Sequence, residues 1–255
     1  MLKKKYFLLV IFKILFLGTI SSSALATNVS LDLPIMSQYA CRGIVWNDEL
    51  VMQPSLTVEW DTGLSFNLWG NMDLTGYGNT SKPNAGYGDR TGEFTELDLT
   101  LDYTKSFGFL SASLGIVSYV FPGIGATTHE VYGSVSADII TSPALTIYSD
   151  VDEVKGSYFL FGLSHTFEIT TEFFKGIDIG SSLGYGSGTY NRSAFGINKA
   201  ALINLDFNLG FNFEVGKIGI TPMCSYSRLL DSELTDKLAK KEQENIFYMG
   251  INVSL

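Results

Sequence analysis

The sequence predicts an all-β fold, a single closed antiparallel transmembrane β-barrel of about 12 strands that follows a cleaved N-terminal signal peptide. Three observations predict it. Apolar and polar residues alternate with period two along many segments, the carboxylates of the clearest segments fall on the polar face, and the N-terminus has the pattern of an exported protein. Period two sorts side chains to the two faces of a strand, whereas a helix would scatter the same residues around its circumference.

The first 26 residues have the three parts of a signal peptide. Lys3, Lys4 and Lys5 give a positive start, Phe7 to Ile20 is apolar apart from Lys13, and Ala24-Leu25-Ala26 is a cleavage pattern. A membrane anchor is the alternative, and a lysine inside a short apolar stretch followed by a cleavage site argues against it. We therefore expect residues 1–26 to be removed and residues 27–255 to form the barrel.

The charge balance argues against nucleic acid as a partner. Four of the 17 basic residues and none of the 26 acidic residues lie in residues 1–26, so the remainder has 13 basic against 26 acidic residues, a net charge of −13. Phosphate binding needs clustered lysine and arginine, which this balance does not favour. The same remainder contains no apolar run of about 18 residues, the length expected of a membrane-spanning helix.

The segment Ala201–Glu214 shows the alternation most clearly. One face carries Ala201, Ile203, Leu205, Phe207, Leu209, Phe211 and Phe213, and the other carries Leu202, Asn204, Asp206, Asn208, Gly210, Asn212 and Glu214. Similar patterns predict further strands around residues 31–38, 55–60, 64–74, 96–103, 110–116, 130–138, 145–150, 158–166, 177–185, 218–226 and 246–255.

Twelve strands place both termini on one side of the membrane, which is the periplasmic side in bacterial barrels. The connections on that side are short, at 61–63, 105–108, 141–143 and 214–217, with a longer one at 169–176. On the opposite side we expect longer connections at 75–92, 121–128, 187–198 and 229–244, and short ones near Asn47 and Asp152. Short periplasmic turns with longer outer loops are typical of the outer membrane of Gram-negative-type bacteria.

A secreted β-sandwich would also alternate, so the apolar face needs a second argument. A charge at the bilayer midplane costs about 2–4 kcal/mol for Lys or Arg, which explains the sorting of charge to one face. The C-terminus adds an unbroken apolar stripe: Phe247, Met249, Ile251, Val253 and Leu255. It resembles the terminal stripe that the outer-membrane assembly machinery reads, although that stripe usually ends in an aromatic residue. We expect outer-membrane lipid and this machinery as partners.

Several motifs resemble the Gcw_chp family of uncharacterised outer-membrane β-barrel proteins. They are Tyr39-Ala40-Cys41-Arg42-Gly43-Ile44, Gln53-Pro54, Gly63 to Trp69, Glu96-Leu97-Asp98, Tyr119-Val120-Phe121-Pro122-Gly123 and Glu130-Val131-Tyr132. The resemblance covers residues 37 to 168, and departs from the family where Tyr39-Ala40-Cys41 precedes the Arg-Gly pair in place of a common serine. It implies a barrel in the outer membrane and no particular substrate.

The sequence does not favour an enzyme. A serine hydrolase in a barrel wall needs a histidine and a serine on one face, but neither His129 nor His165 has a serine two residues on. We expect no catalytic residue, no metal site and no cofactor. Cys41 and Cys224 could form one disulfide or remain free thiols.

The polar face predicts an acidic lumen. We expect the following residues to point inward: Glu59, Asp73, Glu96, Asp98, Asp102, Glu130, Asp138, Asp178, Asp206 and Glu214. Arg42, Lys199 and Arg228 are expected near the outer rim. Acidic linings prefer cations, so the hypothesis is a narrow passive channel for small solutes with cation preference.

Two alternatives remain open. The same carboxylates could be hydrogen-bonded across a filled lumen, because a barrel of twelve strands lies between those that side chains fill and those that hold water. The protein would then be a non-conducting structural or surface-interaction barrel that acts through its loops, especially Thr75–Gly92 with Tyr77, Lys82 and Tyr87. A lipid-modifying enzyme is the more distant alternative.

Overall fold

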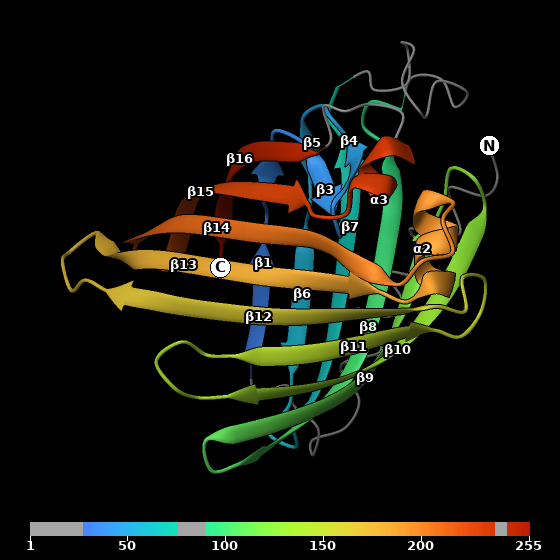
Figure 1. The fold of residues 1–255 in the computed structure, drawn as a ribbon. Coiled ribbons are helices and arrows are strands. Elements are labelled where there is room, and N and C mark those ends of the chain that lie inside the picture. The colour runs from blue at the N-terminus through green and yellow to red at the C-terminus, as the bar shows by residue number, and fades with distance from the viewer. Residues whose placement is uncertain (1–27, 76–89, 238–243) are drawn as a thin grey trace, which may run out of the picture.

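The computed structural model describes residues 28–75, 90–237 and 244–255 (Figure 1). The predicted signal peptide and most of the loop Thr75–Gly92, with Tyr77, Lys82 and Tyr87, lie outside the described residues. None of the described helices has both the length and the apolar character needed to cross a membrane.

The wall is a closed antiparallel sheet. Its strands are β1 (Asn28–Asp32), β2 (Ile35–Met36), β5 (Val51–Met52), β6 (Ser55–Glu59), β7 (Leu64–Asp73), β8 (Phe94–Phe107), β9 (Leu110–Phe121), β10 (Ala126–Ala137), β11 (Ala144–Asp150), β12 (Ser157–Glu168), β13 (Phe174–Gly186), β14 (Ala201–Val215), β15 (Ile218–Leu229) and β16 (Asn245–Ser254). β1 and β2 together form one wall strand, and β5 and β6 form another, so the 14 strands of the sheet make the 12 predicted wall strands.

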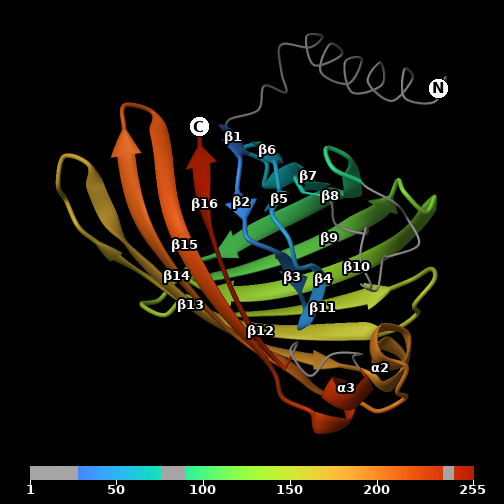
Figure 2. The same ribbon diagram turned by 90° about the horizontal axis from the view of Figure 1, so that it is seen from above.

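The first and last wall strands close the barrel. Asp32 of β1 lies opposite Ser254 of β16, and Ile35 of β2 lies opposite Ile251. The backbone N–H of Leu31 donates to the carbonyl of Leu255 at 3.1 Å. The start of β1 and the C-terminus therefore lie side by side at one end of the barrel (Figure 2).

Proline explains why the first two wall strands are each split. Pro34 separates β1 from β2, and Pro54 separates β5 from β6. Proline cannot donate to a sheet ladder, but both prolines still accept hydrogen bonds. The N–H of Gln53 donates to Pro34 at 2.9 Å, and that of Gly70 donates to Pro54 at 3.0 Å. The wall therefore continues across both breaks.

The two faces of the wall differ as predicted. Large apolar side chains cover the outside; Leu114 is 71% exposed, and Phe247 and Met249 of the C-terminal stripe are also exposed. Monomeric soluble proteins rarely carry apolar patches of this extent. Inside, small polar groups bond across strands, as Thr104 does with Ser113 at 2.6 Å. The outer surface suits lipid and the inner surface suits water.

A β-bulge corrects the predicted faces at the start of β14. Leu183 pairs with Leu205 but Tyr185 pairs with Leu202, so one residue is extra on β14. Consequently Ile203 and Asn204 are both fully buried inside, whereas Leu202 is 45% exposed outside. Ala201 and Ile203 were predicted on the outer face, and that prediction is wrong. An extra residue in a strand turns the side chains beyond it to the opposite face. The faces of residues 201–203 are therefore reversed, whereas those from Leu205 onward are as predicted.

The connections at the far end from the termini are partly structured. The turn between β9 and β10 has only residues 122–125, which corrects the longer connection predicted at 121–128. Helix α2 (Gly188–Phe195) lies between β13 and β14, and α3 (Ser232–Lys237) lies between β15 and β16. The Ser187 side chain accepts the N–H of Tyr190 at the start of α2, and Gly196 ends it with a φ of 75°.

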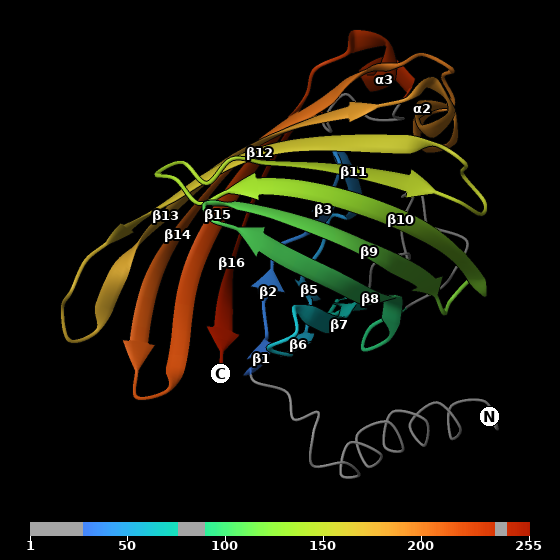
Figure 3. The same ribbon diagram turned by 90° about the horizontal axis from the view of Figure 1, so that it is seen from below.

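The connection near Asn47 was predicted as a short outer turn, but it is a hairpin folded into the barrel (Figures 2 and 3). We call β3 (Tyr39–Cys41), β4 (Ile44–Asn47) and their turn the internal hairpin. Arg42 and Gly43 form the turn with φ values of 51° and 78°, as a two-residue type I′ turn requires. A Cβ on Gly43 would lie 2.6 Å from Leu229 Cδ2 and 3.1 Å from Asn204 Cβ. Glycine therefore lets the tip lie against the inner wall.

Candidate functional site

Arg42 anchors the tip of the internal hairpin to the barrel wall. Its Nη1 donates to Glu130 Oε1 at 2.8 Å, and its Nη2 donates to Oε2 at 2.7 Å. Tyr119 on the neighbouring strand also donates to Glu130 Oε2, at 2.8 Å. The two charged side chains are only 18% and 6% exposed. This is the bidentate, charge-assisted geometry in which arginine–carboxylate pairs are strongest.

Aromatic rings surround the same guanidinium. Arg42 Cζ lies 4.6 Å from the ring centre of Tyr158, 4.8 Å from that of Tyr148 and 5.7 Å from that of Tyr190. Cations within about 6 Å of a ring centre are attracted by its negative face. Arg42 was predicted near the outer rim; the structure corrects this and places it inside the lumen. Tyr190 belongs to α2, so the loop between β13 and β14 helps to hold the hairpin.

An apolar core fills one side of the lumen at the end far from the termini. Its buried members are Tyr158, Tyr190, Phe195, Ala201, Ile203, Leu229 and Leu234, and Ile44 of the internal hairpin packs against them. The bulge in β14 supplies Ile203 to this core. Burial of side chains of this size contributes about 1.5–3 kcal/mol each, so packing as well as charge holds the hairpin in place.

A cavity of about 860 Å³ lies beside the hairpin within the barrel. Its aromatic lining consists of Tyr39, Trp46, Trp69, Tyr119, Phe121, Tyr132, Tyr148, Tyr158, Tyr190 and Tyr248. Its ionisable acids are Glu96, Asp98, Glu130, Asp150 and Asp206, and Arg42 is the basic residue among them. Among the described residues, five carboxylates and one guanidinium give the lining a formal charge of −4. The cavity is therefore aromatic and acidic.

The ten acids predicted to face the lumen fall into four groups. Glu96, Asp98, Glu130 and Asp206 line the cavity. Asp102 and Asp178 lie farther toward the end with the termini, and both accept hydrogen bonds from neighbouring side chains. Asp73 is buried near the opposite end and accepts from Asn47. The remaining three, Glu59, Asp138 and Glu214, are exposed close to the end with the termini. The structure thus brings together four of the ten.

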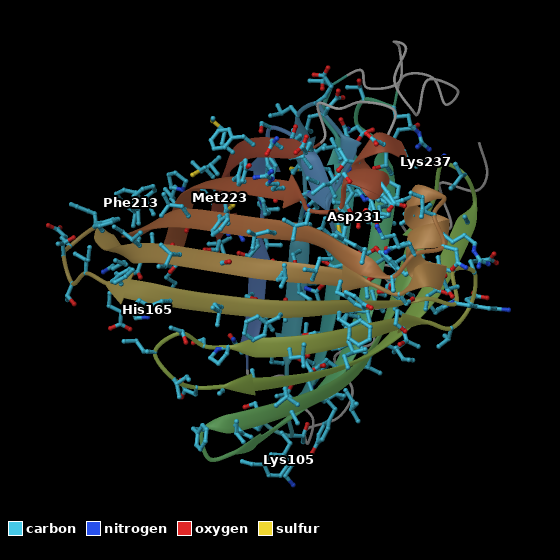
Figure 4. The ribbon with its side chains drawn as sticks, viewed as in Figure 1. Lys105, His165, Phe213, Met223, Asp231 and Lys237 are labelled. Atoms are coloured by element: carbon cyan, nitrogen blue, oxygen red, sulfur yellow. The ribbon has the colours of Figure 1, made fainter. Side chains whose placement is uncertain are left out.

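The other two predicted basic residues lie at the end far from the termini. Lys199, in the loop after α2, pairs with Asp231 at 2.8 Å and with Glu233 of α3 at 2.7 Å. Arg228 is exposed and lies 3.7 Å from Glu244. Figure 4 shows Asp231 and Lys237 at the α3 end of the molecule, with Phe213 and His165 at the opposite end. Because its two partners are Asp231 and Glu233, Lys199 connects the loop that contains α2 with the loop that contains α3.

The Lys199–Asp231 contact predicts a pH dependence of the α3 loop. The carboxylates raise the pKa of Lys199, and the hydrogen bond from Lys199 lowers the pKa of Asp231. The contact is fully stabilising while both groups are charged, which holds above the ordinary aspartate pKa of about 3.9 and below the ordinary lysine pKa of about 10.4. Its contribution is lost when the pH rises through the raised pKa of Lys199 or falls through the lowered pKa of Asp231. We expect a Lys199→Met variant to exchange amide hydrogens in residues 231–237 faster at pH 7, as measured by mass spectrometry. Equal exchange in wild type and variant would contradict this.

Both cysteines are free thiols. Cys41 lines the cavity, whereas Cys224 lies between Leu209 and Met249 on the wall. Met249 is exposed outside, and Met223 and Ser225 on either side of Cys224 line the cavity, so Cys224 faces outward. The barrel wall separates the two sulfur atoms, which excludes the predicted alternative of a disulfide in this structure. Within the described ranges, no group of three His, Cys, Asp or Glu residues could hold a metal ion.

No strong signal in the sequence indicated the internal hairpin. Two-residue hairpin turns favour Asn-Gly or Asp-Gly, and here the first turn residue is Arg42, a residue type that seldom adopts a positive φ. The best available signal was Gly43 between the short apolar segments on either side.

The acid Asp150 was also missed as a lumen residue. It accepts the backbone N–H groups of Asp152, Val154 and Lys155, and so shapes the short turn after β11.

The closed barrel, its apolar outside and its polar lumen define a porin-like transmembrane β-barrel. The solved structure described as KdgM porin is similar, with a TM-score of 0.53 and 12% identity over 88% of this chain and 97% of that one. The COG4313 outer membrane channel from Pseudomonas putida F1 is also similar, with a TM-score of 0.52 and 10% identity over 93% and 96%. At such low identity, these likenesses show the fold alone.

Residues 19–154, more than half of the chain, match the family described as "Bacterial protein of unknown function (Gcw_chp)". The chain belongs to this family, as the motifs between Tyr39 and Tyr132 predicted. A search of curated protein sequences finds no match.

Proposed function

We propose that the protein is a passive channel of the outer membrane for small solutes, with a preference for cations. The observation that carries this proposal is the charge of the cavity, where five carboxylates face one guanidinium that is already paired with Glu130. A low-dielectric wall lined by one sign of charge concentrates counter-ions and repels ions of the same sign. Cations should therefore enter this lumen more readily than anions.

The rest of the lumen is consistent with a water-filled path. Toward the end with the termini, the inner wall carries small hydroxyl side chains, including Ser134 and Thr146, which bond to each other at 2.8 Å. The internal hairpin narrows the other half. The connections at the end with the termini are mostly short, and short connections lie on the periplasmic side in barrels of this kind. We therefore propose that the termini are periplasmic and that the hairpin descends from the outside.

A planar lipid bilayer tests the selectivity. Under a potassium chloride gradient, we expect the purified protein to give discrete currents whose reversal potential shows preference for K⁺ over Cl⁻. The double variant Glu96→Gln/Asp98→Asn removes two of the four net negative charges, so we expect it to roughly halve this preference. The matched control Asp138→Asn/Glu214→Gln removes two exposed carboxylates near the end with the termini and should change it less.

Two results would overturn the proposal. Preference for chloride in the wild type would contradict the acidic path. Absence of current from the wild type and from variants with a loosened hairpin would favour the second candidate, a non-conducting barrel that acts through its outer loops. That candidate is supported by the apolar core around Ile44, Tyr158 and Leu234, which fills part of the lumen.

A further inference from the structure

Asp98 lies between two aromatic side chains on the inner wall. On β7 the residue opposite Asp98 is Trp69, and on β9 it is Tyr119. All three side chains line the cavity, together with Tyr39 of the internal hairpin, whose ring centre lies 5.6 Å from that of Trp69. The register of three adjacent strands thus puts a carboxylate between a tryptophan and a tyrosine.

No basic side chain in the described residues forms an ion pair with Asp98, and the charge of Arg42 acts on it only from beyond ion-pair distance. Asp98 Oδ1 is buried there without a hydrogen-bond donor. The adjacent inward residue is another acid, Glu96, which accepts a hydrogen bond from Tyr39. Arg42 is the basic residue among those that line the cavity, and both ends of its guanidinium are bound to Glu130. A buried carboxylate oxygen without a donor destabilises the protein, because no hydrogen bond replaces the lost contact with water.

The protein already shows how this lining accommodates an organic cation. Arg42 lies among three tyrosine rings with its donors on Glu130. Asp98 with Trp69 and Tyr119 repeats the same elements, a carboxylate and aromatic faces, without a cation. Rings attract organic cations, whereas a hard metal ion needs several oxygen ligands around it. An N–H donor also matches the unpaired oxygen of Asp98.

We propose that Asp98, Trp69, Tyr119 and Tyr39 form a binding site for small organic cations that carry a primary ammonium or guanidinium group. The cavity volume of about 860 Å³ is within the range of small-molecule sites. This inference rests on the proposed function, because it names the class of solute that the channel would take, but binding itself requires no conduction.

Tryptophan fluorescence of the detergent-solubilised protein tests the site, since Trp69 belongs to it. The probe is n-butylammonium chloride, with n-butanol as its neutral analogue and sodium butyrate as its anionic analogue. We expect a saturable change with n-butylammonium alone. Loss of a charge-assisted hydrogen bond should weaken binding about tenfold, so Asp98→Asn should raise the Kd about tenfold. Asp102→Asn, on the same strand and face, should leave it unchanged because Tyr132 and Thr104 already donate to Asp102.

Several outcomes would overturn the binding site. These are the absence of a response to n-butylammonium, an equal response to n-butanol, or an unchanged Kd in Asp98→Asn. Heat-modifiable migration on a denaturing gel shows whether each variant is folded. If Asp98→Asn does not fold, the comparison of n-butylammonium with n-butanol on the wild type tests the site instead. Cation-selective currents without binding would overturn the site and leave the channel. Saturable binding without currents would support the site and contradict the channel.

Discussion

Replacing Arg42 with methionine is expected to release the internal hairpin from the barrel wall and to increase the single-channel conductance in planar bilayers. The change removes both hydrogen bonds to Glu130 and the contacts with Tyr148, Tyr158 and Tyr190. It also leaves Glu130, whose side chain is only 6% exposed, without a positively charged partner. Removing one partner of a buried ion pair costs about 3–5 kcal/mol. The burial of Ile44 stabilises the docked hairpin by less than this.

Two further variants separate release of the hairpin from general damage. Arg42→Met/Glu130→Gln removes the unpaired charge as well, so we expect it to be more stable than the single variant while its conductance stays raised. Arg228→Met removes an arginine that is 54% exposed outside the cavity, and its conductance should equal that of the wild type. If the two Arg42 variants conduct like the wild type, the arginine pair does not hold the hairpin in the lumen.

Replacing Ile116 with arginine is expected to destabilise the protein in lipid by about 2–4 kcal/mol, the cost of a basic side chain at the bilayer midplane. Ile116 lies near the middle of β9 and is 39% exposed on the outer face. Its neighbours across the two adjacent strands, Leu101 and Val131, are also exposed and apolar. The measurement is urea unfolding of the protein refolded into liposomes.

Ser113 provides the matched control. It lies on the same strand three residues away but faces the lumen, where it bonds to Thr104. We expect Ser113→Arg to be destabilised by less than about 1 kcal/mol, because the arginine can remain hydrated. Equal losses at Ser113 and Ile116 would show that the apolar face of β9 does not contact lipid.

The wall of this barrel follows from local sequence. Residues such as Leu99 and Asp98 are neighbours along β8, and their opposite polarities decide which side each one faces. That information repeats in every clear strand, and an even number of strands brings the termini together. The twelve strands and the acidic inner face could therefore be predicted from periodicity, and the sorting of charge to one face together with the apolar C-terminal stripe predicted the closed barrel in lipid. The family could also be predicted, because its motifs lie in contiguous segments.

The tertiary structure alone decided what fills the lumen. Arg42 and Glu130 are 88 residues apart in sequence, and nothing local to either indicates the other. The position of Ile203 depends on a bulge that appears only when β14 pairs with β13. Likewise, Asp98 lies between Trp69 and Tyr119 because of the register of three strands. Alternation is a property of one strand, whereas register, bulges and the inward fold of a hairpin depend on contacts between distant segments. The sequence by itself therefore determined the barrel and its acidic face, and the packing determined the cavity.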